Sequence, residues 1–472
     1  MEILHVSAEC YPVAKVGGLA DVVGALPKYQ QALGHIAKVV TPMYRTKFLY
    51  ENEWEVVHKG SFNMGIQSLN FTIIKEKTNS LGFDFYAVDI NGLLDREKVY
   101  GYDDDSERFT AFQIAVLEWV AHWQHKPDVI NIHDHHTALI PFMLTYCFTY
   151  KHIADVPTVL TIHNAQYQGW MSWDKADYLP TWDTWKWGLL DWSHTINPLA
   201  AGIKTADRVN TVSPGYMQEL MTQANGLESL FQSEWAKCSG ILNGIDYGVW
   251  NPVTDTFILD NFSVKDITEG KELNKKKLCD DFDLNIELPL FVFIGRLVGE
   301  KAADLLPAAI TKAYQEYGTI FNVLILGSGE PRIEHELYSL QNKFVGYYNT
   351  QISYNEKLSH QMYAGADFLL MPSRVEPCGL NQLYAMRYGT IPVVRKTGGL
   401  KDTVIDFGDD GGYGITFINA SVQDIVHAIQ RSITLYRDMD KIKTLRKQMM
   451  QLNFSWEESA QKYIDLYTSI QP

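Results

Sequence analysis

Short apolar stretches of strand length alternate along this chain with amphipathic stretches of helix length, and this alternation restricts the fold more than any other feature. The stretches end in Gly, Ser, Pro or Asn, the usual residues of strand-to-helix turns. The expected strands lie at residues 2–7, 37–42, 83–89, 128–133, 157–162 and 207–212, and then at 288–294, 321–326, 344–348, 368–371, 391–394 and 414–418. Two clear helices are expected at residues 303–317 and 331–343, and a hairpin at 55–77. The pattern predicts parallel sheets that are covered by helices on both faces.

The length of 472 residues suits two or three domains. A turn-rich connection that includes Asn251-Pro252 predicts a boundary near residues 245–255. We therefore expect two doubly wound, Rossmann-like α/β domains, residues 1–248 and 249–455, facing each other across a crevice, and a last helix at about 456–472. In such sheets ligands bind beyond the carboxyl ends of the strands, so the site residues should lie in strand-to-helix turns.

Charge and cysteine content exclude several classes of function. The chain has 41 Lys and Arg against 56 Asp and Glu, a formal net charge of −15. An acidic chain repels phosphate backbones and anionic lipids, so we expect neither nucleic-acid nor membrane binding. No apolar run approaches the ~20 residues that span a bilayer, and the first residues resemble no signal or transit peptide. The five scattered cysteines form no CxxC motif, which argues against a disulfide framework or a cysteine zinc site and favours a cytoplasmic location.

Two turns carry glycines or cations in positions that suit a phosphate. Lys15 precedes Gly17 and Gly18 where the first strand gives way to a helix. The glycines let a ligand approach the backbone and the helix N-terminus favours an anion, although a plain glycine turn is the alternative. Arg296 follows the first strand of the second domain, and Lys301 lies five positions later. Cations oppose the helix dipole there, so their presence favours an anionic ligand over ordinary surface charge.

Two further turns of the second domain are candidates. Thr397, Gly398 and Gly399 open a helix, and free amides at that place suit a phosphate. Glu376 is placed to accept hydrogen bonds from sugar hydroxyls, although an acid that merely complements a helix dipole is nearly as good an explanation. Cys378 stands near a helix N-terminus, which lowers a thiol pKa, but no histidine base adjoins it in sequence, so we do not expect thiol catalysis.

Histidines mark the ends of two strands of the first domain. His133, Asp134, His135 and His136 follow one another, but their spacing matches no zinc pattern, and the adjacent His135 and His136 are expected to point apart. We expect no metal there and favour a hydroxylated ligand. His163 ends the next strand and is an active-site candidate, with a structural histidine as the alternative.

Six of the twelve tryptophans fall between Trp170 and Trp192. Aromatic faces stack on sugar rings, but an insertion packed as a satellite cluster explains the same density. The sequence leaves both explanations open.

Taken together, the motifs resemble those of the bacterial glycogen synthase and starch synthase family of glycosyltransferases, over residues 1 to about 460. The motifs that carry the resemblance are KVGGLADV at 15–22, HDHH at 133–136, TIHN at 161–164, ADRVNTVSP at 206–214, ILNGID at 241–246, GRL at 295–297, MPSRVEPCGL at 371–380, QLYAMRYGTIPVV at 382–394 and TGGL at 397–400. So many motifs in register are highly specific.

The resemblance implies a glycosyltransferase-B fold whose terminal helix crosses back to the first domain. It implies transfer of glucose from the donor ADP-glucose to the non-reducing end of an α-1,4-glucan, such as glycogen or a maltooligosaccharide, with the anomeric configuration retained. It implies no cofactor and no metal, because Arg and Lys neutralise the departing diphosphate. The choice between ADP-glucose and UDP-glucose stays open.

The resemblance also implies a role for each matching residue. The expected diphosphate ligands are Arg296 and Lys301, bordered by Lys15, Gly17 and Gly18 and assisted by Thr397, Gly398 and Gly399. The expected donor-sugar ligands are Glu376 and His163, with Asp134 and Asn243 on the same floor and Cys378, Gly379 and Leu380 beside Glu376. Tyr354 matches the aromatic residue that stacks on the nucleobase, and Asp21 lies near the nucleoside.

Some positions depart from the family pattern. Tyr384 stands where many related enzymes carry a second Glu, Ala302 replaces the more usual Gly, and Gln166 and the segment 170–192 have no firm match. Three alternatives remain: a nucleotide-sugar epimerase, a glucan phosphorylase, and a catalytically inactive nucleotide-sugar sensor. The retained Lys15, His163, Arg296, Lys301 and Glu376 argue against the sensor.

Overall fold

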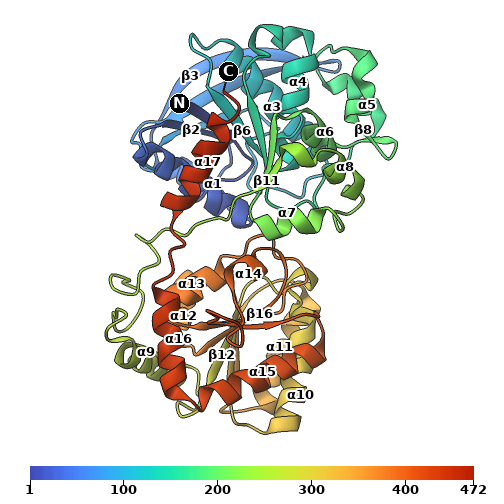
Figure 1. Ribbon diagram of the computed structural model, residues 1–472. Coiled ribbons are helices and arrows are strands. Elements are labelled where there is room, and N and C mark those ends of the chain that lie inside the picture. The colour runs from blue at the N-terminus through green and yellow to red at the C-terminus, as the bar shows by residue number, and fades with distance from the viewer. Residues whose placement is uncertain (472) are drawn as a thin grey trace. The chain divides into compact units, whose positions relative to one another are not determined.

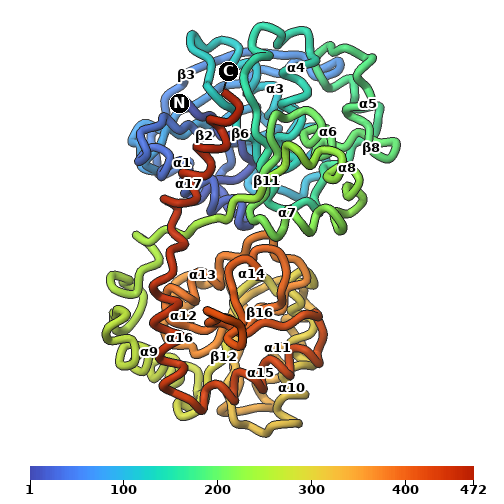
Figure 2. The backbone as a smooth tube through the Cα atoms, viewed as in Figure 1, coloured from blue at the N-terminus to red at the C-terminus, as the bar shows by residue number. Residues whose placement is uncertain are grey.

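The computed structural model describes residues 1–471 and divides the chain into two compact units. The first comprises residues 1–243 and 456–471, and the second comprises Gly244–Ser455. Figure 1 shows that each is built on one sheet with helices against both faces, which confirms the doubly wound α/β class. The tube in Figure 2 shows the chain leaving the first unit near residue 243 and returning to it as the last helix.

The sheet of the first unit has nine strands in the order β11-β10-β7-β6-β1-β2-β5-β4-β3. Its strands are β1 (Glu2–Val6), β2 (Ile36–Pro42), β3 (Trp54–Met64), β4 (Gln67–Glu76), β5 (Asp84–Asp89), β6 (Val129–His133), β7 (Thr158–Ile162), β10 (Arg208–Thr211) and β11 (Cys238–Gly240). All neighbours pair in parallel except β3 with β4 and β4 with β5, which are antiparallel. The antiparallel β3 and β4 confirm the expected hairpin.

The helices of the first unit are α1 (Gly18–Ala32), α2 (Lys47–Glu51), α3 (Asp105–Ala121), α4 (Ile140–Tyr146), α5 (Trp187–Leu190), α6 (Pro198–Thr205), α7 (Pro214–Leu220), α8 (Glu228–Ser233) and α17 (Trp456–Thr468). A two-stranded sheet of β8 (Asp191–Trp192) and β9 (Thr195–Ile196) lies within the tryptophan-rich segment. The last helix, α17, lies beside α1 (Figure 1), and its buried face packs on Ile3, Val22, Leu26, Val129 and Val159.

The sheet of the second unit has six parallel strands in the order β14-β13-β12-β15-β16-β17. They are β12 (Leu290–Ile294), β13 (Asn322–Gly327), β14 (Tyr348–Ile352), β15 (Phe368–Met371), β16 (Ile391–Arg395) and β17 (Ile415–Phe417). The helices are α9 (Ile267–Asp281), α10 (Leu306–Tyr317), α11 (Pro331–Lys343), α12 (Glu356–Gly365), α13 (Asn381–Arg387), α14 (Gly398–Thr403), α15 (Val422–Tyr436) and α16 (Met439–Met450).

Successive residues of the central strands enter two different cores. Phe291 and Phe293 of β12 pack in one buried cluster, whereas Leu290 and Val292 pack in another. Side chains alternate across a strand, so a strand buried on both faces is apolar throughout. This is why the sequence pattern located β12 so closely.

The strand expected at residues 344–348 is misplaced, because β14 begins only at Tyr348. Phe344 instead caps α11, and Val345 is 74% exposed. β14 lies at the edge of the sheet, where one side of a strand meets water and the apolar pattern weakens. Among residues 1–471, no helix is both long and apolar enough to cross a membrane.

Candidate active site

The turn after β1 is held by one buried carboxylate, Glu9. Its Oε2 accepts hydrogen bonds from the backbone amides of Val16 (2.6 Å) and Gly17 (3.0 Å), and its Oε1 accepts one from the Tyr100 hydroxyl (2.7 Å). Burial raises the pKa of Glu9, against the lowering effect of these donors. Sequence reasoning missed Glu9 and Tyr100. An acid directly after an apolar strand was the only available signal.

The glycines of this turn have no packing requirement within the chain. A Cβ atom added at Gly17 or Gly18 would meet no atom of residues 1–471 within 4 Å, and neither residue has the left-handed backbone that favours glycine. Lys15 and Asp21 form an ion pair at 2.7 Å beside them. Open space at two successive glycines is what the close approach of a ligand to the backbone requires.

Asp134 and His163, from the ends of β6 and β7, lie together. Oδ1 of Asp134 accepts hydrogen bonds from the backbone amides of His163 (2.6 Å) and Asn164 (3.3 Å). Burial raises the pKa of Asp134 to about 7 and lowers that of His163 to about 3. Asp134 also has φ 57° and ψ −176°, which is close to a region nearly reserved for glycine. Such strain and perturbed acidity concentrate at functional sites.

The expectation that His135 and His136 point apart is wrong. Their ring centroids lie 3.7 Å apart, and the His136 ring also stacks on Tyr100 at 4.7 Å. The reason is that both residues belong to a short 3-10 helix, His135–Thr137, and not to the strand. The described part of the chain contains no group of three or more His, Cys, Asp or Glu side chains placed to hold a metal ion.

Asn243 closes the first unit and is 5% exposed. Within residues 1–471 its buried Oδ1 accepts no hydrogen bond. An unsatisfied buried acceptor costs free energy, so a ligand hydroxyl is a natural partner for it.

In the second unit, Lys301 and Glu376 form the centre of the candidate site. Nζ of Lys301 lies 2.7 Å from Oε1 and 2.8 Å from Oε2 of Glu376, and the Ser373 hydroxyl donates to Oε2 at 2.8 Å. Glu376 is 7% exposed. The structure therefore brings these two expected ligands together across 75 positions of sequence, and it adds Ser373 as a third member.

Arg296 extends from the turn after β12 and is half exposed. Its only ion pair among the described residues is with Glu300, at 3.3 Å. Such a pair is too weak to explain why an arginine stands at this turn. Nearby, Ala302 has φ 53°, in the left-handed region, which gives a physical reason for the glycine that is usual at that place.

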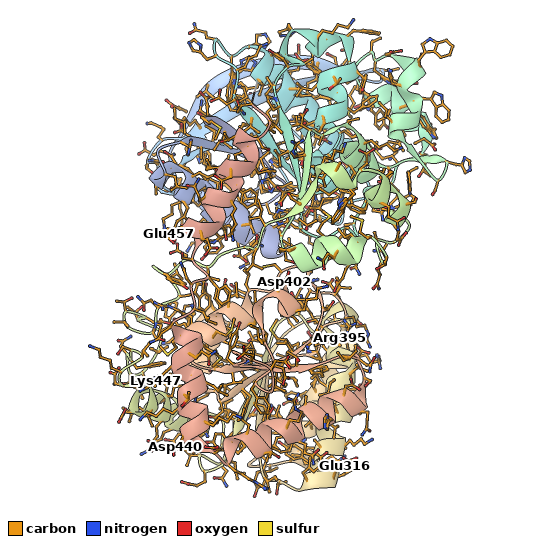
Figure 3. The ribbon with its side chains drawn as sticks, in the orientation of Figure 1. Glu316, Arg395, Asp402, Asp440, Lys447 and Glu457 are labelled. Carbon is orange, nitrogen blue, oxygen red and sulfur yellow. The ribbon has the colours of Figure 1, made fainter. Side chains whose placement is uncertain are left out.

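The turn that carries Glu376 is fixed by two other arginines. Arg374 forms two hydrogen bonds with Asp304, at 2.6 and 2.9 Å. Arg395, labelled in Figure 3, extends from the end of β16 and donates to the carbonyl oxygens of Ser373 (3.3 Å) and Arg374 (2.9 Å). A carboxylate on a turn held in this way keeps its position without a ligand.

The residues after Glu376 pack against the turn of Gly398 and Gly399. A Cβ atom at Gly398 would lie 2.0 Å from the Glu376 carbonyl oxygen, and one at Gly399 would lie 2.1 Å from that of Cys378. The amide of Gly399 donates to the carbonyl oxygens of Glu376 and Pro377, each at 3.1 Å. These glycines are therefore required by packing, and the Gly399 amide already has partners within the chain.

The other expected nucleotide-sugar ligands lie around this turn. Gly379 has φ 73° and lies next to Gln382, whose Nε2 donates to the carbonyl oxygens of Cys378 (3.0 Å) and Gly379 (2.9 Å). Leu380 is half-buried and precedes α13, and Thr397 is buried before α14.

Two aromatic residues of the second unit have opposite environments. Tyr354, just after β14, is 74% exposed, as a residue that stacks on a ligand ring must be before the ligand binds. The Tyr384 ring is stacked on Trp250 at 3.7 Å. That aromatic partner accounts for a tyrosine where many related enzymes carry Glu.

The tryptophan-rich segment is partly packed and partly exposed. Trp182 packs on Phe142, and Nε1 of Trp192 donates to the Gly226 carbonyl oxygen at 2.9 Å. Trp185 and Trp187 are 91% and 56% exposed. Neither explanation offered by the sequence covers the whole segment.

Known proteins match this chain over its whole length. Residues 2–233 match the family model described as starch synthase catalytic domain, and residues 275–449 match glycosyl transferases group 1. A glycogen synthase of Flavobacterium johnsoniae is 54% identical over 470 residues, covering 100% of this chain and 99% of that protein. A glycogen synthase of Streptococcus pneumoniae is 38% identical, with full coverage of both chains.

Solved structures give the same result. The catalytic domain of starch synthase IV from Arabidopsis thaliana, bound to ADP and acarbose, superposes with a TM-score of 0.90 at 33% identity over 99% of each chain. A sucrose-phosphate synthase from Thermosynechococcus elongatus, at 18% identity and a TM-score of 0.64, covering 100% of this chain and 99% of that one, shares the fold.

Proposed function

Because the chain belongs to the glycogen synthase and starch synthase family of glycosyltransferases, we propose that it transfers glucose from ADP-glucose to the non-reducing end of an α-1,4-glucan, with the anomeric configuration retained and without a metal ion. The observation that carries this proposal is the contact of the half-buried Lys301 with the buried Glu376 and Ser373, near the half-exposed Arg296. Two cations and a carboxylate that can accept hydrogen bonds from sugar hydroxyls thus lie in turns at the same edge of the sheet.

In this proposal the cations neutralise the negative charge of the departing diphosphate. When the bond between the anomeric carbon and the phosphate oxygen breaks, its electrons go to the diphosphate. The planar guanidinium group of Arg296 can donate hydrogen bonds to two phosphate oxygens, and Lys301 adds a point charge. Fixed cations at developing negative charge act most strongly in a closed, dry site. Lys15 and the open backbone at Gly17 and Gly18 are further candidate phosphate ligands.

Glu376 serves as a ligand for sugar hydroxyls, not as a covalent nucleophile. Both of its carboxylate oxygens accept hydrogen bonds from Nζ of Lys301, and Oε2 also accepts one from the Ser373 hydroxyl. These donors stabilise the carboxylate where it is and lower its nucleophilicity. The acceptor hydroxyl then attacks the anomeric carbon on the face from which the diphosphate departs, and its proton passes to the departing phosphate oxygen.

His163, Asp134 and Asn243 are the further ligands of the donor sugar in this proposal. The unsatisfied Oδ1 of Asn243 and the strained backbone of Asp134 support this assignment. We assign residues 1–248, with the last helix, to the acceptor side and residues 249–455 to the nucleotide sugar. Cys378, Gly379, Leu380, Thr397, Gly398 and Gly399 shape the nucleotide-sugar site, Tyr354 stacks on the base and Asp21 lies near the nucleoside.

The acceptor is glycogen or a maltooligosaccharide, and no cofactor is needed. Five free cysteines support a reducing, cytoplasmic location. The exposed Trp185 and Trp187 offer sugar-stacking faces for a long glucan. The acidic composition supports the absence of nucleic-acid and membrane partners.

One assay tests the proposal against its alternatives. Labelled ADP-glucose is incubated with glycogen, with and without an excess of unlabelled UDP-glucose. Label in the polymer, reduced little by UDP-glucose, supports the proposal. Epimerised sugar indicates an epimerase, and bound but unreacted donor indicates a sensor. A phosphorylase would release glucose 1-phosphate from glycogen and phosphate, and its pyridoxal cofactor would give a visible absorbance band.

A further inference from the structure

A continuous line of buried hydrogen bonds leads from the last helix to His163. Nε2 of His163 lies 3.0 Å from Nδ1 of His133, and Nε2 of His133 lies 3.1 Å from Nδ1 of His5. Nε2 of His5 lies 2.8 Å from Oε1 of Gln30, and Nε2 of Gln30 lies 3.4 Å from the Tyr467 hydroxyl of α17.

The line continues for two more bonds and ends on the backbone. The Tyr467 hydroxyl lies 2.6 Å from Oδ1 of Asn131, and Nδ2 of Asn131 lies 3.0 Å from the Val159 carbonyl oxygen. Tyr467 and Asn131 are, like His5, His133 and Gln30, fully buried, and all belong to the first unit. Bulk water therefore does not reach these five side chains.

The backbone end fixes the direction of every proton in the line. A carbonyl oxygen only accepts, so the Asn131 amide must turn its NH₂ group to Val159 and its Oδ1 to Tyr467. The Tyr467 hydroxyl then donates its single proton to Oδ1, and can only accept from Gln30. Gln30 must therefore turn its NH₂ group to Tyr467 and its Oε1 to His5.

The orientation of Gln30 also determines which ring nitrogen of each of the three histidines donates its proton. Gln30 offers an acceptor, so His5 carries its proton on Nε2. Burial lowers the pKa of His5 to about 4, that of His133 well below its usual range and that of His163 to about 3, so each ring carries one proton at neutral pH. Nδ1 of His5 then accepts from Nε2 of His133, and Nδ1 of His133 accepts from Nε2 of His163.

We propose that His133, His5, Gln30 and Tyr467 are positioning residues that hold His163 in the tautomer protonated on Nε2, so that its Nδ1 accepts a hydrogen bond from a hydroxyl of the donor sugar. Within residues 1–471, Nδ1 of His163 has no hydrogen-bond partner of its own. The inference rests on the proposed function for the identity of the sugar. The tautomer itself rests on the hydrogen bonds and on the burial that keeps the rings neutral, and it needs no assumption about the sugar.

The line also gives the last helix a chemical role. Tyr467 lies 304 positions after His163 in the sequence, yet its hydroxyl joins the anchored amide of Asn131 to Gln30. Without that hydroxyl, Gln30 is free to turn its amide over, and a turned amide would offer His5 a donor. Every histidine of the line would then reverse, and Nδ1 of His163 would carry the proton.

Nitrogen NMR of protein labelled with ¹⁵N in histidine reads the tautomer directly, and a His163→Asn sample identifies the signals. We expect Nε2 of His163 to be protonated and Nδ1 to be unprotonated at neutral pH in the wild-type protein. A protonated Nδ1 would overturn the proposal. This measurement needs no activity, so it stands even if labelled ADP-glucose is not transferred, which would refute the proposed function alone.

Two matched pairs of variants test the line. His133→Met removes both polar atoms, whereas His133→Gln keeps one acceptor and one donor. We expect His133→Met to give mixed tautomers of His163 and a kcat/KM for ADP-glucose lowered about tenfold, which corresponds to one lost hydrogen bond. His133→Gln should recover the wild-type tautomer and most of the activity. Equal losses in the two variants with an unchanged tautomer would overturn the proposal.

The second pair lies on α17 and covers the case in which His133→Met does not fold. Tyr467→Phe removes the link, and Tyr463→Phe removes a hydroxyl of the same helix that accepts from Asn210. We expect mixed tautomers of His163 only in Tyr467→Phe, with thermal unfolding measured for both. Wild-type tautomers in Tyr467→Phe would overturn the proposal.

Discussion

Replacement of Arg296 by alanine separates a role in catalysis from a role in folding. The side chain is half exposed, and the one ion pair that it forms within residues 1–471, with Glu300, is 3.3 Å long. An exposed pair of this kind contributes at most about 0.5 kcal/mol, so the melting temperature should fall by no more than about 2 °C. The loss of a donor at the departing charge should instead lower kcat by about 10²–10³, or about 2.7–4 kcal/mol.

The assay is the initial rate of glucose transfer from ADP-glucose to glycogen, measured over a range of donor concentrations. Because the charge develops in the transition state, kcat should fall more than KM rises. Arg296→Lys keeps the positive charge but loses the planar guanidinium group that donates two parallel hydrogen bonds, and we expect it to recover part of the rate.

Arg431→Ala is the matched control. Arg431 forms two hydrogen bonds with Asp406, at 2.7 and 3.0 Å, so its loss should lower stability by about 1–3 kcal/mol and leave the kinetics of the folded enzyme close to wild type. If Arg296→Ala keeps kcat within about threefold, or melts as early as Arg431→Ala, the assignment of Arg296 to the diphosphate is refuted.

Three other predictions test neighbouring parts of the site. Gly17→Ala should fold normally and raise the KM for ADP-glucose, whereas Gly399→Ala should melt early, because its Cβ would lie 2.1 Å from a carbonyl oxygen; equal melting curves would contradict this. Mass spectrometry of the enzyme with ADP-glucose should find no glycosyl adduct on Glu376, and a trapped adduct would show a covalent mechanism. The raised pKa of Asp134, about 7 against 3.8, means that the folded protein keeps its proton while the unfolded chain ionises. As the pH rises from about 4 to about 7, the wild type should therefore lose stability relative to Asp134→Asn. Thermal unfolding of both proteins across this range measures the effect, and parallel plots of melting temperature against pH would contradict the raised pKa.

The fold could be predicted from the sequence wherever a strand is covered on both faces. β12 and β15 were located within two residues because every side chain in them is apolar. The prediction failed at the edge strand β14, whose half-exposed residues read as a loop, and it missed the three-residue β11, which also lies at the edge of its sheet. A short, partly exposed edge strand has too few buried apolar residues to show a pattern.

The candidate site could be predicted only as separate turns. Parallel strands end at one edge of a sheet, so the sequence indicates which turns are neighbours. It does not indicate which side chains bond to each other. The pairing of Lys301 with Glu376, the hold of Glu9 on the Gly17 amide and the use of Gly399 for packing all depend on distances that only the folded chain defines.

The histidine line marks the limit of what a sequence can reveal about chemistry. His5 is visible as a polar residue between the apolar Leu4 and Val6, and a buried polar group requires a partner. The sequence cannot say whether that partner donates or accepts, because the answer is fixed six hydrogen bonds from His163, at the carbonyl group of Val159. The tautomer of His163 is thus a property of the whole line, and a substitution on α17 that touches no ligand is expected to change it.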